Sequence, residues 1–210
     1  MPTERRADAR GVETRGKLLA AAEQLLLDEG YASVTSRRVG ARAGVAPQLV
    51  HYHFRSMEEL FVELVRRQGE VGCAAFEELV GTNPSIAELW AFQAGQPLSP
   101  LSAELVALAN HHKAVRVTIA QFGRRFRELH TVAVTAALRR AGLSTDHFPP
   151  DVITVLMTAT IQLLGQEEAI GMDESHAATS GFLLRLAAAI DDDGWVRALN
   201  AGAAAMVSTT

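Results

Sequence analysis

The sequence predicts an all-α protein, in which a small N-terminal helical domain is followed by a larger helical domain. Apolar residues recur at helical spacing through most of the 210 residues, and no run alternates apolar and polar residues long enough for a convincing strand. Glycines and prolines fall between the periodic segments, where they end one helix and begin the next. Since 48% of the residues are hydrophobic, the chain can bury a sizeable core.

The first periodic segment covers residues 12–29. Its apolar side chains lie at helical spacing and predict one buried face, made of Leu18, Leu19, Ala22, Leu25 and Leu26. Gly30 is placed to end this helix, because glycine readily adopts the left-handed conformation of a C-terminal cap. Residues 1–11 are charged and lack apolar periodicity, which predicts a disordered N-terminal arm.

Two short helices follow, and a tight glycine turn separates them. Thr35 is a suitable N-cap for the first, and Gly44 ends it. Pro47 suits the first position of the second helix, which runs to about residue 53. Such a pair predicts a helix-turn-helix, whose second helix presents its N-terminal side chains to base edges in the major groove.

The next helix begins with a capping box, formed by Ser56 and Glu59. Its apolar stripe consists of Leu60, Phe61, Leu64 and Val65. We therefore expect residues 12–65 to form a three-helix helix-turn-helix domain that binds DNA, with a recognition helix at about 47–53.

The distribution of charge is consistent with contact to nucleic acid. Residues 31–57 contain no carboxylate, although they include Arg37, Arg38, Arg42, His51, His53 and Arg55. A segment without acids can approach a phosphate backbone without repulsion. Chance spacing of acids in a helical protein produces the same pattern, so the charge alone does not establish DNA binding.

A resemblance to a known family is carried by residues 34–60, VTSRRVGARAGVAPQLVHYHFRSMEEL. This run resembles the DNA-binding module of the TetR family of transcriptional regulators, and the match extends over residues 12–65. It combines the glycine turn, the His53-Phe54 pair and the Ser-x-x-Glu-Leu helix start at fixed offsets. The resemblance implies a regulator that binds double-stranded DNA.

The resemblance also implies which side chains contact DNA. The matching positions are Ser36, Arg37, Pro47, Gln48, Leu49, His51, Tyr52 and His53. Ser36 and Arg37 match positions that touch phosphates and base edges. Gln48 could pair with adenine, and Leu49 could contact a thymine methyl group. The last three residues of the set match an aromatic cluster that contacts the DNA backbone.

Two positions depart from the family pattern. The family usually has tyrosine where His51 stands and lysine where Met57 stands. A neutral histidine still donates one hydrogen bond to phosphate, whereas Met57 donates none, so backbone N–H groups at that helix start are the alternative donors. Arg42 is equally compatible with a solvated helix-face charge, and His53 with local packing.

Residues 66–206 are predicted to form the larger helical domain. Helices are expected at residues 85–94, 101–112, 114–141, 151–172 and 175–190, and the alanine-rich segment from Trp195 to Met206 predicts one more short helix. The family resemblance implies that this domain forms a homodimer and binds a small molecule.

The last two long helices are the expected dimer interface, as a four-helix bundle made by two subunits. The candidate interface residues are Val155, Leu156, Ala159, Leu163, Phe182 and Leu186. The same apolar faces are compatible with a core inside one chain. A homodimer would place two recognition helices about one DNA turn apart, which predicts a palindromic operator.

A ligand site between helices needs apolar lining and a few polar anchors. The candidates by residue type and position are Trp90, Phe92, Phe122, Phe126, Met157, Gln162 and Gln166. A helical aromatic residue is equally compatible with plain core packing. Few charges lie near the centre of these helices, which favours an apolar ligand.

No pattern indicates an enzyme, a cofactor or a metal site. Cys73 lacks a base within local helical reach, His111 and His112 cannot chelate one metal from one helical face, and Glu167 lacks a histidine three or four residues away. No glycine-rich phosphate loop or nucleophile elbow is present. Neither a secretory signal nor an apolar run of spanning length is visible, which predicts a cytoplasmic protein without membrane contact.

The combined expectation is a repressor that a small, mostly apolar ligand releases from a palindromic operator. The resemblance is also compatible with an activator. The alternative is a helical DNA-binding protein that is controlled by a protein partner or has no small-molecule effector.

Overall fold

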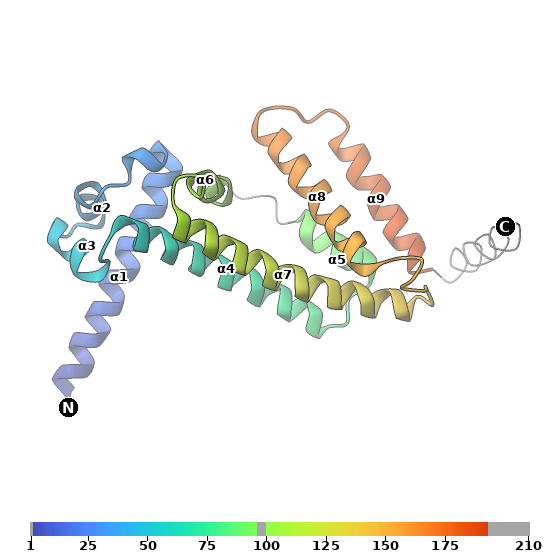
Figure 1. Ribbon diagram of the computed structural model, residues 1–210, viewed down its shortest axis with the longest axis horizontal. Coiled ribbons are helices and arrows are strands. Elements are labelled where there is room, and N and C mark those ends of the chain that lie inside the picture. The colour runs from blue at the N-terminus through green and yellow to red at the C-terminus, as the bar shows by residue number, and fades with distance from the viewer. Residues whose placement is uncertain (1, 96–99, 193–210) are drawn as a thin grey trace, which may run out of the picture. The chain divides into compact units, whose positions relative to one another are not determined.

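The computed structural model describes residues 2–95 and 100–192, with side chains from residue 10 onward (Figure 1). Within these ranges the chain is helical and has no strand, which confirms the predicted all-α class. The helices are α1 (Pro2–Glu29), α2 (Ser36–Ala43), α3 (Pro47–His53), α4 (Met57–Gly81), α5 (Ile86–Ala94), α6 (Pro100–Leu108), α7 (Lys113–Arg140), α8 (Pro150–Ala169) and α9 (His176–Ile190), with a 3-10 turn at Tyr31–Ser33. None of these helices combines the length and apolar character that a membrane span requires.

The chain divides into two compact units. The first consists of residues 1–72 and 99–123, and the second of residues 73–98 and 124–210. The boundary that we expected near residue 65 therefore differs from the observed division, in which α6 and the start of α7 belong to the first unit. The physical reason is packing, because Leu101, Leu105 and Leu108 of α6 lie in the same core as the apolar stripe of α1.

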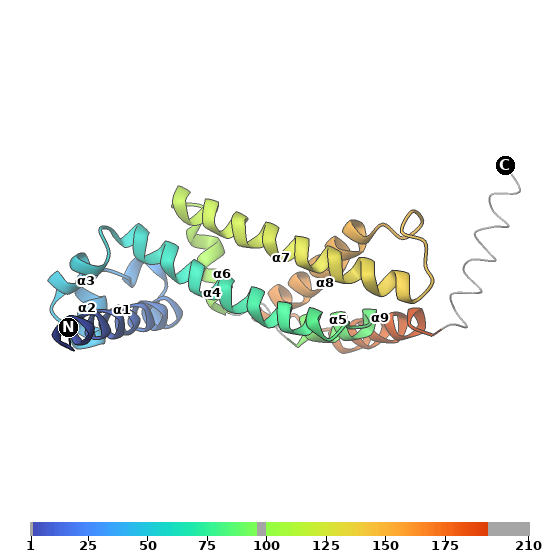
Figure 2. The same ribbon diagram turned by 90° about the horizontal axis from the view of Figure 1, so that it is seen from below.

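Helices α2 and α3 pack against each other, and α2 packs against α1 (Figures 1 and 2). The Thr35 hydroxyl caps α2 by accepting a hydrogen bond from the backbone N–H of Arg38. Gly44 follows α2 in the left-handed conformation at φ 69°. A Cβ at position 40 would lie 3.0 Å from the Val45 carbonyl oxygen, so Gly40 lets the turn close onto α2. These local features produce the predicted helix-turn-helix.

The N-terminal segment differs from the expectation. In the structure, residues 2–11 continue α1 instead of forming the disordered arm that we expected. The sequence has no proline between Pro2 and Gly30, and ion pairs such as that between Lys17 and Glu13 (2.7 Å) support the exposed helix surface.

The second unit is built from the end of α4, α5, the later part of α7, α8 and α9. Helix α5 packs against both α8 and α9. The largest side chain that is fully buried there is Phe76, which contacts the rings of Phe92 and Phe126 at centroid distances of 5.5 and 4.9 Å. The short helix expected from Trp195 to Met206 lies outside the described residues.

Candidate nucleic-acid interface

Helix α3, the expected recognition helix, is held by two buried side chains. Val50 and Phe54 are almost completely buried in the first-unit core, and Phe54 is the C-cap residue of α3. Because these two residues face inward, the first turn of α3 is left outside, and Pro47, Gln48 and Leu49 are all exposed. The helix therefore presents an amide and an apolar side chain at the end that a helix-turn-helix directs toward base edges.

The C-terminal half of α3 carries the predicted aromatic cluster. His51 is exposed and His53 is half-buried. Tyr52 is 80% exposed and meets the His53 ring edge to face at a centroid distance of 5.1 Å. Tyr52 is large and amphipathic, and at this exposure its hydroxyl is accessible to a hydrogen-bonding partner. Met57 is half-buried and packs against the first-unit core.

The arginines of α2 differ in the charges around them. Arg38 pairs with Glu29, and Arg42 pairs with Asp28 at 2.9 Å and with Glu29 at 3.4 Å. For Arg37, which is exposed, the described part of the chain offers no ion pair, whereas Ser36 beside it is half-buried. Asp28 and Glu29, at the end of α1, thus partly neutralise the positive charge of residues 31–57. Among the described residues, Arg37 is the arginine of α2 whose charge stays unpaired.

A residue that the sequence did not single out supports the end of α3. The Arg15 guanidinium of α1 lies 4.9 Å from the centroid of the Phe54 ring and forms an ion pair with Glu63 of α4 at 3.0 Å. This hydrogen bond from Arg15 lowers the pKa of the Glu63 carboxyl. Arg15 thereby connects α1, the C-cap of the recognition helix and α4. Its contacts lie 39 and 48 residues away, so a local pattern could not reveal them.

The predicted capping box at the start of α4 is only partly formed, because the Glu59 carboxylate binds the backbone N–H of Arg55 and not that of the N-cap residue Ser56. The Ser56 hydroxyl accepts a hydrogen bond from the backbone N–H of Glu59 at 3.1 Å, while the Glu59 carboxylate accepts one from the backbone N–H of Arg55 at 2.8 Å.

The residues predicted to bind a ligand are only partly brought together. Trp90 and Met157 are buried in the second-unit core, and Phe92 and Phe126 pack against it. Gln162 and Gln166 are exposed on α8. Phe122 belongs instead to the first-unit core, where its ring packs against α4. The four residues Trp90, Phe92, Phe126 and Met157 remain candidates for one common site.

Polar groups that the sequence did not single out lie in the same core. His130 is fully buried and Gln93 nearly so, and the Gln93 amide nitrogen lies 2.9 Å from Nε2 and 3.4 Å from Nδ1 of the imidazole. The Thr158 hydroxyl lies 3.4 Å from the Gln93 amide oxygen. Burial lowers the pKa of His130 to about 4, so the ring is neutral at pH 7.

The predicted dimer residues have exposed apolar side chains. On α8, Leu156 is 61% exposed, and Val155, Ala159 and Leu163 are exposed as well. On α9, Phe182 is 57% exposed and Leu186 is half-buried. Large apolar side chains exposed together are typical of surfaces that bind another protein.

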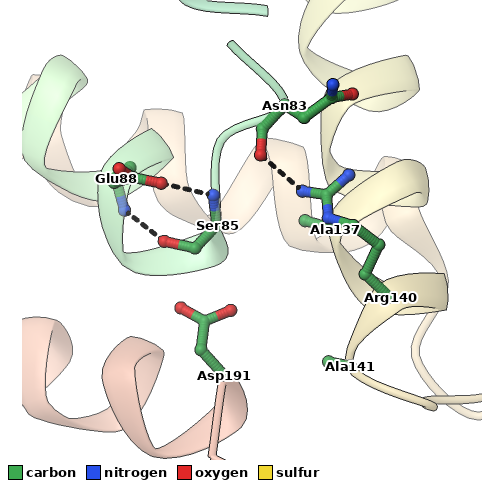
Figure 3. Close-up of a pocket in the computed structure, with 7 residues that line it drawn as sticks. All are labelled: Asn83, Ser85, Glu88, Ala137, Arg140, Ala141 and Asp191. Atoms are coloured by element: carbon green, nitrogen blue, oxygen red, sulfur yellow. Dashed lines mark hydrogen bonds between the residues drawn. The ribbon is translucent and has the colours of Figure 1, made fainter.

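A polar pocket of about 240 Å³ lies in the second unit, and none of its lining residues was predicted (Figure 3). The Asp191 carboxylate accepts hydrogen bonds from the backbone N–H groups of Ile86 and Ala87, at 3.2 and 3.1 Å. Ser85 and Glu88 form a capping box, and Arg140 donates to the backbone carbonyls of Asn83 and Pro84. These polar groups satisfy the start of α5, which is a structural role.

Residues that could support other chemistry are not assembled. Within the described ranges, no group of three His, Cys, Asp or Glu side chains could hold a metal ion. Cys73 is buried, and burial raises the pKa of its thiol, which makes it a poor nucleophile.

Comparison with known sequences identifies the first domain. Residues 18–64 match the model of a family described as bacterial regulatory proteins, tetR family. Over 55 residues, or 26% of this chain, the sequence is 36% identical to the HTH-type transcriptional activator FasR from Mycolicibacterium smegmatis. The match covers 25% of FasR, so the chain spans about a quarter of the length of this curated relative. The family resemblance of the N-terminal residues is confirmed.

Solved structures share the fold over most of the chain. FadR from Bacillus subtilis, in complex with stearoyl-CoA, has a TM-score of 0.62 at 14% identity, with 84% of this chain and 97% of FadR covered. A transcriptional regulator from Saccharomonospora viridis, in complex with choline, has a TM-score of 0.69 at 17% identity, with 83% and 94% covered. A third regulator, from Rhodococcus sp. Rha1, has a TM-score of 0.62 at 20% identity, with 82% and 95% covered. At these identities the similarity shows the fold.

Proposed function

We propose that this chain, whose residues 18–64 match the model of the tetR family of bacterial regulatory proteins, is a sequence-specific transcriptional regulator that acts as a homodimer. The observation that carries the proposal is the first turn of α3, where Gln48 and Leu49 are exposed while Val50 and Phe54 fix the helix from behind. In the proposed complex Gln48 and Leu49 read base edges, with Pro47 beginning the helix that carries them.

The proposed phosphate contacts surround this reading end. Arg37 and Ser36 lie in the first turn of α2, and His51, Tyr52 and His53 follow along α3. Arg37 supplies the fixed positive charge, while the tyrosine and histidine side chains donate neutral hydrogen bonds. This division predicts that much of the affinity comes from hydrogen bonds that salt screens only weakly.

A homodimer is supported by the exposed apolar side chains of α8 and α9. Isolated α3 contacts too few base pairs for strong discrimination, whereas two copies across a two-fold axis read two half-sites about 34–36 Å apart. We therefore propose a palindromic operator, with the dimer formed through Leu156, Leu163 and Phe182 and their neighbours on the same helices.

The second unit is proposed to bind a small, mostly apolar effector. Support comes from its aromatic core and from the absence of a charged side chain among its described buried residues. FadR from Bacillus subtilis and the regulator from Saccharomonospora viridis were crystallised with small molecules, stearoyl-CoA and choline. We propose that the effector releases the protein from its operator, as in a repressor that acts in the cytoplasm.

Selection of duplexes from a random-sequence pool tests this function with the full chain. We expect enriched sites with two inverted half-sites, and the Gln48→Ala variant should lose base preference at one position in each half-site. An enriched site without two-fold symmetry would contradict the proposed homodimer on a palindromic operator. The lack of any enriched site would contradict sequence-specific DNA binding. Repeating a gel shift on the selected duplex with a panel of metabolites then tests for an effector, and a partner-controlled protein would respond to none of them.

A further inference from the structure

The core of the second unit contains a buried imidazole–amide pair, formed by His130 of α7 and Gln93 of α5. His130 is 0% exposed and Gln93 is 7% exposed. Burial of polar groups in an apolar core is costly unless their hydrogen bonds are made. An apolar contact could join the same two helices without the cost of burying polar groups. The pair is therefore expected to have a role besides packing α5 against α7.

The hydrogen bonds of this pair are incomplete. A neutral imidazole has one N–H donor and one nitrogen acceptor. Both ring nitrogens of His130 lie nearest to the same amide group, at 2.9 and 3.4 Å from the Gln93 nitrogen. The Gln93 amide nitrogen can donate a hydrogen bond to the acceptor nitrogen of the imidazole, but it cannot accept one from the imidazole N–H.

Turning the amide round does not complete the set. The Gln93 oxygen would then accept from the ring N–H, and the amide nitrogen would lie beside the Thr158 hydroxyl. The acceptor nitrogen of His130 would have no donor within the described residues. Although both ring nitrogens have the Gln93 amide beside them, either arrangement leaves one hydrogen-bonding position of this fully buried ring without a complementary donor or acceptor.

The surroundings of the ring are aromatic and uncharged. Phe76 lies 5.4 Å and Phe126 lies 6.1 Å from the imidazole, measured between ring centroids. Phe76 is fully buried, whereas Phe126 and Phe92 are half-buried, so aromatic side chains extend from the surface of the unit to the imidazole. A charged group placed here would lose its hydration without gaining a counter-ion.

We infer that His130 and Gln93 form the polar anchor of the effector site and that the effector is an uncharged, largely apolar molecule whose one hydrogen-bonding group pairs with the imidazole. This inference rests on the proposed function, since it identifies the chemistry of the proposed effector. Trp90 and Met157, in the same core cluster, are the apolar part of the site. The expected chemical class is a phenol, an alcohol, a ketone or an uncharged amide.

A series of three probes with one ring system tests the inference by calorimetric titration of the full chain: naphthalene, 1-naphthol and 1-naphthoate. We expect saturable binding of one 1-naphthol per chain, about tenfold weaker binding of naphthalene because it lacks the hydrogen bond, and still weaker binding of the carboxylate. In the His130→Phe variant the preference for naphthol over naphthalene should disappear. Thr158→Val, which leaves the imidazole in place, should retain most of that preference.

Gln121→Leu is the matched control, because it removes an exposed amide from α7, the helix that also carries His130. It should leave all three affinities unchanged. An unchanged naphthol preference in His130→Phe, tighter binding of the carboxylate than of naphthol, or no saturable binding of naphthol to the natural chain would overturn the inference. If His130→Phe does not fold, His130→Leu takes its place, with the same loss of preference expected, because it also removes the imidazole.

Failure of the inference can be told from failure of the proposed function. A chain that selects a palindromic duplex but shows no naphthol preference retains the proposed function and loses the inferred anchor. A chain that selects no duplex but binds naphthol through His130 loses the proposed function and keeps the anchor site.

Discussion

Gly69 of α4 lies directly against the ring of Phe122 of α7, within the first unit. A Cβ atom added at position 69 would overlap with Cγ and both Cδ atoms of that ring. The Cγ atom is close to the backbone of α7, so a change of rotamer alone gives little room. Glycine at this position therefore sets how closely α4 and α7 approach, with the Phe122 ring packed between the two helices.

We expect Gly69→Ala to lower the free energy of unfolding by about 1–3 kcal/mol, because the added methyl group overpacks the contact. Urea denaturation followed by circular dichroism measures the effect. Gly72→Ala is the matched control on the same helix, since an added Cβ there would meet no atom within 4 Å. It should raise the stability by up to about 1 kcal/mol through helix propensity. Equal effects of the two substitutions would contradict the role given to Phe122.

Local signals in the sequence were enough to predict the helix-turn-helix. Thr35, Gly44 and Pro47 act on their immediate neighbours, and each occupies the predicted capping or turn position. The division into units could not be predicted in this way, because α6 joins the first-unit core through contacts with residues far away in the chain. The end of α6 also differs from the prediction. Residues 109–112 form a turn, whereas we expected the helix to continue to residue 112.

The candidate effector residues were predicted by type, and type alone could not separate Phe122 from Phe126. The two residues lie four positions apart on α7, yet one packs in the first-unit core and the other in the second. His130 and Gln93 were missed because they are 37 residues apart and neither belongs to a motif. Their pairing follows from tertiary packing, which one sequence does not reveal.

The arginines of α2 are expected to differ in their effect on DNA binding. Arg37→Ala should weaken binding to every duplex and reduce the slope of log affinity against log salt by about one, since one phosphate contact is lost. Arg42→Ala should change the slope little, because Asp28 and Glu29 already neutralise that charge. Fluorescence anisotropy across a range of salt concentrations measures both slopes. The same reduction in the two variants would show that the ion pairs of Arg42 do not persist on DNA.

The exposed apolar side chains of α8 and α9 predict an effect on oligomeric state. Leu156→Glu and Phe182→Glu should each convert a dimer into a monomer, because a carboxylate buried without a partner is costly. Light scattering after size-exclusion chromatography measures the mass. Val71→Glu is the control, since Val71 of α4 is 63% exposed and lies outside these helices. A dimer that survives both substitutions in α8 and α9 would place the interface elsewhere.

The hydrogen bonds from the start of α5 to Asp191 predict a long-range contribution to stability. Figure 3 shows the Asp191 side chain among the residues of this pocket. Asp191→Ala removes the acceptor for two backbone N–H groups across 105 residues of sequence, and it should lower the free energy of unfolding by about 1–2 kcal/mol. Asp191→Asn keeps one oxygen acceptor and should lose less. Thermal melts of the three proteins rank them, and an alanine variant as stable as the natural chain would show that water replaces the carboxylate at no cost.

The buried imidazole of His130 predicts how stability depends on pH. Its pKa is about 4 in the folded chain, compared with 6.5 for an ordinary histidine. Between these values the unfolded chain binds a proton that the folded chain does not, so stability falls as the pH decreases from 6.5 to 4 and is unaffected by this group above that range. The full effect is about 3 kcal/mol at the acid end.

Denaturation of the natural chain and of His130→Gln at several pH values isolates this contribution, because the carboxylates that also titrate at acid pH are common to both. The difference in unfolding free energy between the two proteins should be constant from pH 8 to 7 and should then change steadily, in favour of the variant, down to pH 4. A difference that stays constant over the whole range would mean that His130 is protonated as readily in the folded chain as in the unfolded one.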